Sequence, residues 1–146
     1  EGGRIDPMAA VRLEYRHGSR AVRVMERIAK NPREARVVCE CEPVLEAEVR
    51  YVVEHELASS VEDVSRRTRL GLGSCGGMRC AARCGAIIAQ IKERSPESGR
   101  RDALRFVEWT RKRRLAAVGP EQARQEALAL AHLRAEIGDE PGEGEP

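Results

Sequence analysis

The chain has 146 residues, enough for one domain with a modest core or for a small domain with extensions. Apolar residues make up 41% and aromatic residues only 3%, so the core must be aliphatic, which suits small, closely packed helices. Charged residues make up 34%, but the formal net charge of +2 excludes a basic field over the whole molecule that would recruit nucleic acid.

Helical periodicity dominates the first half of the chain. Apolar residues recur at spacings of three and four in residues 21–28 and again in residues 45–53, which predicts two buried helix faces. Pro43 is expected in the first turn of the second helix, where a missing N–H has no intrahelical partner to lose. The longest alternating stretch, "VRLEYR" at residues 11–16, is too short to indicate a sheet.

Further helices are predicted along the second half. Ser60 with Asp63 resembles a capping pair at the start of a helix that "LGLG" then breaks. A fourth helix is expected from about Met78 to Lys92. The stretch "ERSPESGRRD" reads as a linker, followed by two helices with Gly119–Pro120 as stop and start. The fold class is therefore mostly α.

The chain contains five cysteines, arranged as Cys39-x-Cys41, then 33 residues, then Cys75-x4-Cys80, with Cys84 beyond. No stretch approaches the ~20 apolar residues of a membrane span and there is no apolar signal-peptide core, so we expect a cytoplasmic protein. In that reducing compartment an odd number of cysteines favours metal binding over disulfides. Four converging thiolates can hold either a tetrahedral Zn²⁺ or an iron–sulfur cluster.

The glycines around the second cysteine pair would let backbone N–H groups approach a cluster's sulfur atoms. Both pairs adjoin predicted helix starts, and helix N-termini favour thiolates. Cys84 lies four residues after Cys80, on the same predicted face as the isoleucines of the fourth helix, so we expect it to pack in the core. His17, His55 and His132 are far apart in sequence and are interpreted as surface or packing residues.

The segment "VVCECEPVLEAEVRYVVEHELASSVEDVSRRTRLGLGSCGGMRC" resembles the [2Fe–2S]-binding domain related to bacterioferritin-associated ferredoxin (BFD-like domain). It is most similar to the version at the C-terminus of the A subunit of anaerobic, FAD-dependent glycerol-3-phosphate dehydrogenase. The C-x-C-E motif, "RRTRLGLGSC" and the C-x4-C spacing carry this resemblance, which covers residues 37–92 specifically.

The resemblance implies that Cys39, Cys41, Cys75 and Cys80 are the cluster ligands and that no residue of this chain is catalytic. It implies an electron-transfer module of an oxidoreductase, with FAD bound only in a missing upstream domain. The implied partners are a flavin-containing dehydrogenase domain or subunit, together with further iron–sulfur or membrane-anchor subunits, which could hold the module at the inner face of the membrane. Nucleic acid and a direct membrane span are not expected. The alternative is a non-redox module in which the same four cysteines hold zinc.

Four segments follow from this interpretation. They are an N-terminal segment and helix linking to an upstream region (1–36), a helical BFD-like domain whose helices flank the cysteine-bearing loops (37–94), a C-terminal helical extension (95–138) and a disordered acidic tail (139–146).

Overall fold

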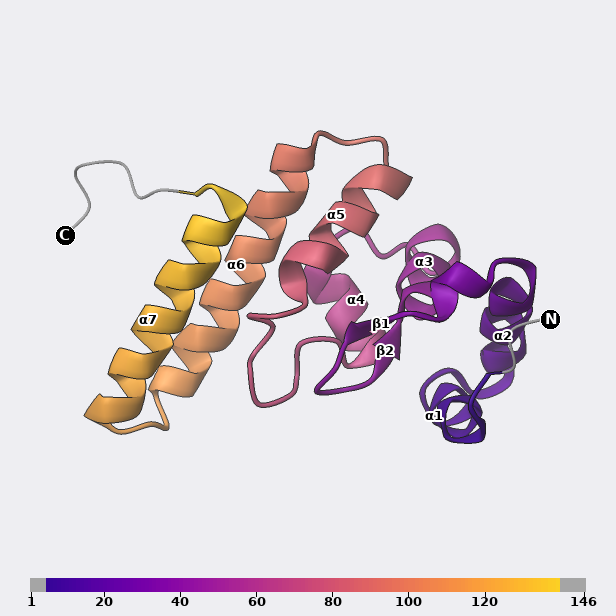
Figure 1. Ribbon diagram of the computed structural model, residues 1–146, viewed down its shortest axis with the longest axis horizontal. Coiled ribbons are helices and arrows are strands. Elements are labelled where there is room, and N and C mark those ends of the chain that lie inside the picture. Colours follow the sequence, from indigo (N-terminus) through magenta and orange to yellow (C-terminus); the bar gives the residue numbers. More distant parts are fainter. Residues whose placement is uncertain (1–4, 140–146) are drawn as a thin grey trace.

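The computed structural model describes residues 5–139, and most of them lie in helices, so the prediction of a mostly α fold is confirmed. The described elements are α1 (Pro7–His17), η1 (Gly18–Arg20), α2 (Ala21–Lys30), η2 (Pro32–Ala35), β1 (Val37–Cys39), β2 (Val44–Leu45), α3 (Glu46–His55), α4 (Val61–Thr68), α5 (Ala81–Ile91), α6 (Pro96–Leu115) and α7 (Pro120–Ile137). The molecule is elongated, with α1 and α2 at one end, α3, α4 and α5 in the middle, and α6 and α7 side by side at the other end (Figure 1).

The N-terminal helices begin and pack as simple helix rules require. The carboxylate of Asp6 accepts the N–H of Ala9 at 3.2 Å, and Pro7 occupies the first helical position of α1. The alternating stretch at residues 11–16 lies inside this helix. In α2 the apolar stripe of residues 21–28 faces the core, as its spacing predicts.

The two strands form a short antiparallel pair that places the first cysteine segment. Cys39 in β1 is opposite Val44 in β2, with an irregular register between. The prediction that Pro43 occupies the first turn of α3 is wrong, because Val44 and Leu45 pair with β1 before the helix begins. The Glu48 carboxylate then accepts the N–H of Leu45 at 2.7 Å, which caps the start of α3.

The second cysteine segment joins α4 to α5. The Oγ of Ser60 accepts the N–H of Asp63 at 3.1 Å, which confirms the predicted helix start of α4. The expected start of α5 near Met78 is wrong by about one turn. Gly76 and Gly77 have left-handed φ angles of +59° and +89°, and the chain continues in turns through Cys80 until α5 begins at Ala81.

The first C-terminal helix, α6, begins earlier than predicted. The prediction of a linker at residues 93–102 is wrong from Pro96 onward, because α6 begins there. Ser95 caps the helix, and its Oγ accepts the N–H of Ser98 at 3.2 Å. Gly99 allows a close crossing with α5, since a Cβ on it would lie 2.6 Å from the carbonyl oxygen of Gly85. The predicted stop and start at Gly119–Pro120 is confirmed.

One aliphatic core runs through α1 to α6 and reaches two leucines of α7. Among the described residues, no helix is both long enough and apolar enough to cross a membrane. Apart from Asp139, the predicted acidic tail lies outside the described residues. The segment boundaries after residues 36 and 94 stay predictions.

Candidate metal centre

The two cysteine segments approach each other in the middle of the molecule. Cys39 ends β1, and Cys41 lies in the turn that follows it. Cys75 lies in the segment between α4 and α5 (residues 69–80), which we call the glycine-rich loop, and Cys80 is the residue immediately before α5. Cys39 and Cys80 are about 1% exposed, whereas Cys41 and Cys75 are half-buried. The site therefore has a buried side and a side that reaches solvent.

The structure joins the four predicted ligands as two pairs, each with one cysteine from either segment. The Sγ atoms of Cys41 and Cys75 lie 3.6 Å apart. The Cys80 thiol donates to the carbonyl oxygen of Gly77 at 3.8 Å and is close enough to Cys39 to lower the pKa of that thiol. Cys75 is also close enough to Cys80 to influence its ionisation. In residues 5–139 as they stand, no group of three or more His, Cys, Asp or Glu side chains is arranged to hold a single metal ion.

The surroundings of Cys39 favour a thiolate. Its pKa is lowered to about 5, first by the hydrogen bond from Cys80 and then, against the cost of burial, by backbone N–H groups of Gly71, Glu42 and Cys41. The pKa of Cys80 is raised in turn, because its proton is shared with Cys39 and because it is buried beside other sulfurs. Backbone donors aimed at one sulfur are the environment that stabilises negative charge on a ligand.

The glycine-rich loop comes very close to the cysteines, and only glycine permits this. A Cβ on Gly73 would lie 2.3 Å from the Cβ of Cys41. Gly71 and Gly77 have left-handed φ angles of +78° and +89°, and the aromatic ring of Phe106 packs directly against their backbone. The loop is thus shaped around the cysteines on one side and around Phe106 on the other.

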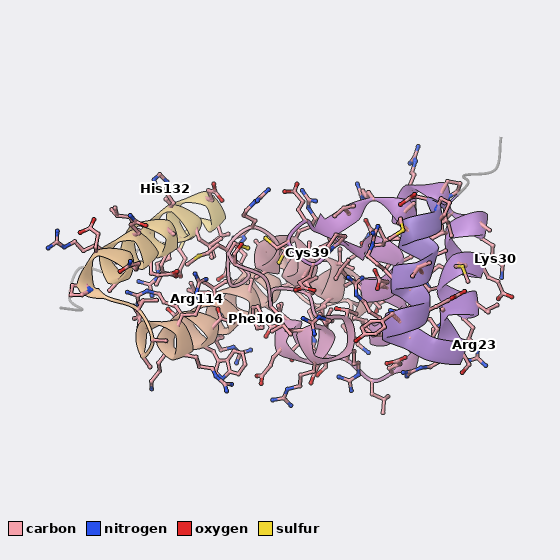
Figure 2. All side chains as sticks on the ribbon, turned by 90° about the horizontal axis from the view of Figure 1, so that it is seen from below. Arg23, Lys30, Cys39, Phe106, Arg114 and His132 are labelled. Atoms are coloured by element: carbon pink, nitrogen blue, oxygen red, sulfur yellow. The ribbon has the colours of Figure 1, made fainter. Side chains whose placement is uncertain are left out.

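Helix α6 covers this loop, a contact that the sequence did not reveal. Besides Phe106, the Thr110 hydroxyl donates a hydrogen bond to the carbonyl oxygen of Gly76 at 2.7 Å. Arg114 lies over Gly76 as well and forms an ion pair with Glu126 of α7 at 2.5 Å. In Figure 2 Phe106 lies between Arg114 and Cys39 in the view. No local pattern signals the contacts between α6 and this loop, because their partners are 29 to 38 residues apart.

Side chains of α1 form a second set of contacts that the sequence did not predict, with the turn that follows Cys41. Arg16 donates to the carbonyl oxygens of Glu42 and Pro43 at 2.9 and 2.8 Å, and to the Glu48 carboxylate at 3.0 Å. His17, interpreted from sequence as a surface or packing residue, is buried and donates to the same carboxylate at 3.1 Å, since a carboxylate only accepts. This cluster fixes the turn immediately after Cys41.

Cys84 lies in α5, fully buried among the core side chains, as its position in the sequence predicts. Burial raises the pKa of its thiol, so it stays protonated and behaves as a small apolar group.

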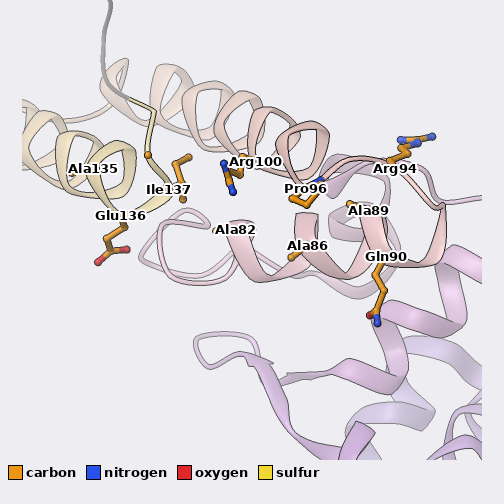
Figure 3. Close-up of a pocket in the computed structure, with 11 residues that line it drawn as sticks. Ala82, Ala86, Ala89, Gln90, Arg94, Pro96, Arg100, Ala135, Glu136 and Ile137 are labelled. Atoms are coloured by element: carbon orange, nitrogen blue, oxygen red, sulfur yellow. The ribbon is translucent and has the colours of Figure 1, made fainter.

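Two hollows border this region. An open groove of about 500 Å³ borders Cys75 and runs between the glycine-rich loop and α7. A larger hollow of about 690 Å³ lies between α5, the start of α6 and the end of α7, with four alanines among its eleven lining residues and no cysteine (Figure 3). Of these two hollows, the groove is the one that a cysteine borders.

The fold and this geometry define a small helical domain built around a cysteine centre. A family model described as the C-terminal domain of alpha-glycerophosphate oxidase matches residues 3–98, which is more than half of the chain. The chain belongs to this family. No solved structure matches the chain significantly.

Curated relatives agree with the family match. The A subunit of anaerobic glycerol-3-phosphate dehydrogenase from Haemophilus influenzae is 36% identical over 94 residues, which cover 64% of this chain and 16% of that protein. The corresponding protein of Escherichia coli K12 is 38% identical over 77 residues, 53% of this chain and 14% of that protein. A glycerol 3-phosphate dehydrogenase of Caloramator mitchellensis is 33% identical over 66 residues, 44% of this chain and 14% of that protein. The relation to the dehydrogenase that the sequence led us to expect is confirmed, for 14–16% of the length of those proteins.

Proposed function

We propose that Cys39, Cys41, Cys75 and Cys80 hold a [2Fe–2S] cluster and that the chain is the iron–sulfur electron-transfer module of a larger, FAD-dependent glycerol-3-phosphate dehydrogenase. The observation that carries the proposal is the approach of the two cysteine segments, with the sulfur atoms of Cys41 and Cys75 3.6 Å apart. The relatives named glycerol-3-phosphate dehydrogenase support the parent activity.

The residues present fit such a cluster. Four thiols from two loops match the ligand number of a [2Fe–2S] centre, and the low pKa of Cys39 supplies a thiolate without a strong base. Backbone N–H groups stabilise negative charge on sulfur, and they are close because the loop glycines lack a Cβ. The half-buried Cys41 and Cys75 leave one edge of the site near solvent.

When bound, the cluster would supply one-electron transfer between the flavin of an upstream domain and further iron–sulfur or membrane-anchor subunits that deliver electrons to quinone. The residues of this chain bind and orient it, exclude water from the Cys39 and Cys80 side, and set its potential through hydrogen bonds. None of these tasks requires an acid, a base or a nucleophile, so the module itself is non-catalytic. Its proposed location is cytoplasmic, at the inner face of the membrane through the partner subunits.

Zinc in the same four thiolates is the alternative, and metal analysis separates the two. After anaerobic purification we expect about two iron and two acid-labile sulfide per chain, with visible absorption that dithionite bleaches. Colourless protein with about one zinc and no sulfide would establish the zinc module instead. Cys75→Ser should lose the cluster, whereas the matched control Cys84→Ala should retain it. Wild-type iron and sulfide in Cys75→Ser would refute the ligand set.

A further inference from the structure

One side of α6 carries an unusual concentration of uncompensated positive charge. Exposed residues recur at spacings of three and four along this helix, which places them on one face. We call this surface the basic face; it consists of Arg101, Arg105, Trp109, Lys112 and Arg113. Trp109, the single tryptophan of the chain, lies at its centre and is 39% exposed.

The cations of the basic face have little compensation. Arg105 pairs with Asp102 at 3.4 Å, but within residues 5–139 no carboxylate lies within ion-pair distance of Arg101, Lys112 or Arg113. The guanidinium of Arg113 instead stacks over the Trp109 ring, 4.6 Å from its centroid. The neighbouring carboxylates of Glu97 and Glu108 pair with Arg100 and Arg134, so the basic face keeps an excess of positive charge that is complementary to an acidic surface.

The tertiary structure, not the sequence run, defines this surface. The basic run at residues 111–114 divides between two sides of α6. Arg114 faces α7 and pairs with Glu126, and Arg111 is half-buried, while Lys112 and Arg113 stay on the exposed side. The surface also begins beyond residue 98, where the family match ends.

The basic face is connected to the cysteine centre by direct contacts. Trp109 stacks on Phe106 with ring centroids 6.1 Å apart. The Phe106 ring packs on the backbone of Gly71 and Gly77, in the loop that carries Cys75. One aromatic ring therefore joins the exposed indole to the cysteine-bearing loop.

We infer that the basic face is the docking surface for an acidic electron-transfer protein. This inference rests on the proposed function, which requires a partner close to the cysteine centre. The charge of the surface selects an acidic partner, and the central aromatic ring is the kind of side chain that anchors protein interfaces. A protein is favoured over a lipid surface or nucleic acid because the surface is one helix wide, lies beside the centre and belongs to a molecule with a net charge of only +2.

Calorimetric titration of the full chain tests this inference without using activity. The probes are oxidised flavodoxin, an acidic electron-transfer protein, and cytochrome c, a basic one. Flavodoxin should bind at low salt and weaken at least about 10-fold between about 20 and 300 mM salt, because surface charges are then screened. Cytochrome c should not bind. Because the titration works with and without a loaded centre, its result is independent of the metal analysis.

Charge reversal supplies the matched comparison. The variant with Arg101, Arg105, Lys112 and Arg113 changed to Glu should bind flavodoxin at least about 10-fold more weakly at low salt. The control changes Arg23 and Lys30 to Glu, exposed cations of α2 at the opposite end of the molecule (Figure 2), and should change binding less than about 2-fold.

If the fourfold variant does not fold, Arg101→Gln with Lys112→Gln replaces it and should weaken binding about 3-fold or more. Equal binding by the basic-face and control variants, or no flavodoxin binding at low salt, would overturn the inference. So would a shift of Trp109 fluorescence with phosphatidylglycerol vesicles in the absence of any flavodoxin binding, because the surface would then be a lipid-binding one.

Discussion

Arg16→Met should destabilise this fold far more than removal of an ordinary surface charge. The Arg16 side chain is 7% exposed, and its guanidinium bonds the Glu48 carboxylate and two backbone carbonyls of the turn after Cys41. Glu48 is completely buried, so the substitution leaves a carboxylate in the core without its cation.

The size of the effect follows from these contacts. Breaking a buried ion pair from one side typically costs about 3–5 kcal/mol. Glu48 would keep its bonds to the N–H of Leu45 and to His17, so we expect the low end, about 3 kcal/mol. With a urea dependence of about 2 kcal/mol per molar for a domain of this size, the unfolding midpoint should fall by about 1.5 M.

Urea unfolding followed by far-ultraviolet circular dichroism measures this shift, with Arg12→Met as the matched control. Arg12 is on the same helix, one turn earlier, and its side chain is 37% exposed with a 3.7 Å ion pair to Asp6. Such exposed pairs contribute about 0–1 kcal/mol. A midpoint for Arg16→Met that coincides with that of Arg12→Met would refute the reasoning that Arg16 compensates a buried charge.

Two further outcomes are expected. Gly71→Ala should lower the unfolding free energy by about 2–4 kcal/mol in the same assay, because φ at Gly71 is +78° and the new Cβ would lie 2.6 Å from the Phe106 ring. The control Gly18→Ala, where φ is +55° and no atom lies within 4 Å of the new Cβ, should lower it by only about 1 kcal/mol. Equal losses in the two variants would contradict the packing argument. In the reduced, metal-free protein, ultraviolet thiolate absorbance should show one thiol titrating near pH 5, because the pKa of Cys39 is lowered to about 5 from an unfolded value of about 8.5. The Cys39 thiolate stabilises the folded state fully above the unfolded pKa, and this stabilisation is lost as pH falls through about 5. The unfolding free energy should therefore decrease from about pH 8 to about pH 5. The same pH dependence in Cys39→Ser would contradict the assignment to Cys39.

Local features of the sequence were sufficient for most of the helices. Periodic apolar stripes predicted α2 and α3, and the Ser60 cap predicted α4, because these signals act within a few residues of chain. The prediction of a linker at residues 93–102 was wrong, because Ser95 and Pro96 begin a helix there and Gly99 lies inside it. Only the crossing with α5 explains why a glycine occurs inside a helix there.

The family resemblance nominated four cysteines as ligands, and the position of Cys84 on the apolar face of its helix was enough to place it in the core. The sequence alone could not say which cysteines would be paired across the two loops, or that Arg16 and α6 would support those loops from opposite ends of the chain. Spacing and periodicity report contacts within a few turns of the backbone. The pairing of Cys41 with Cys75, the bonds of Arg16 and the contact of Phe106 with Gly71 each join residues 26 to 35 positions apart, and only folding brings such residues together.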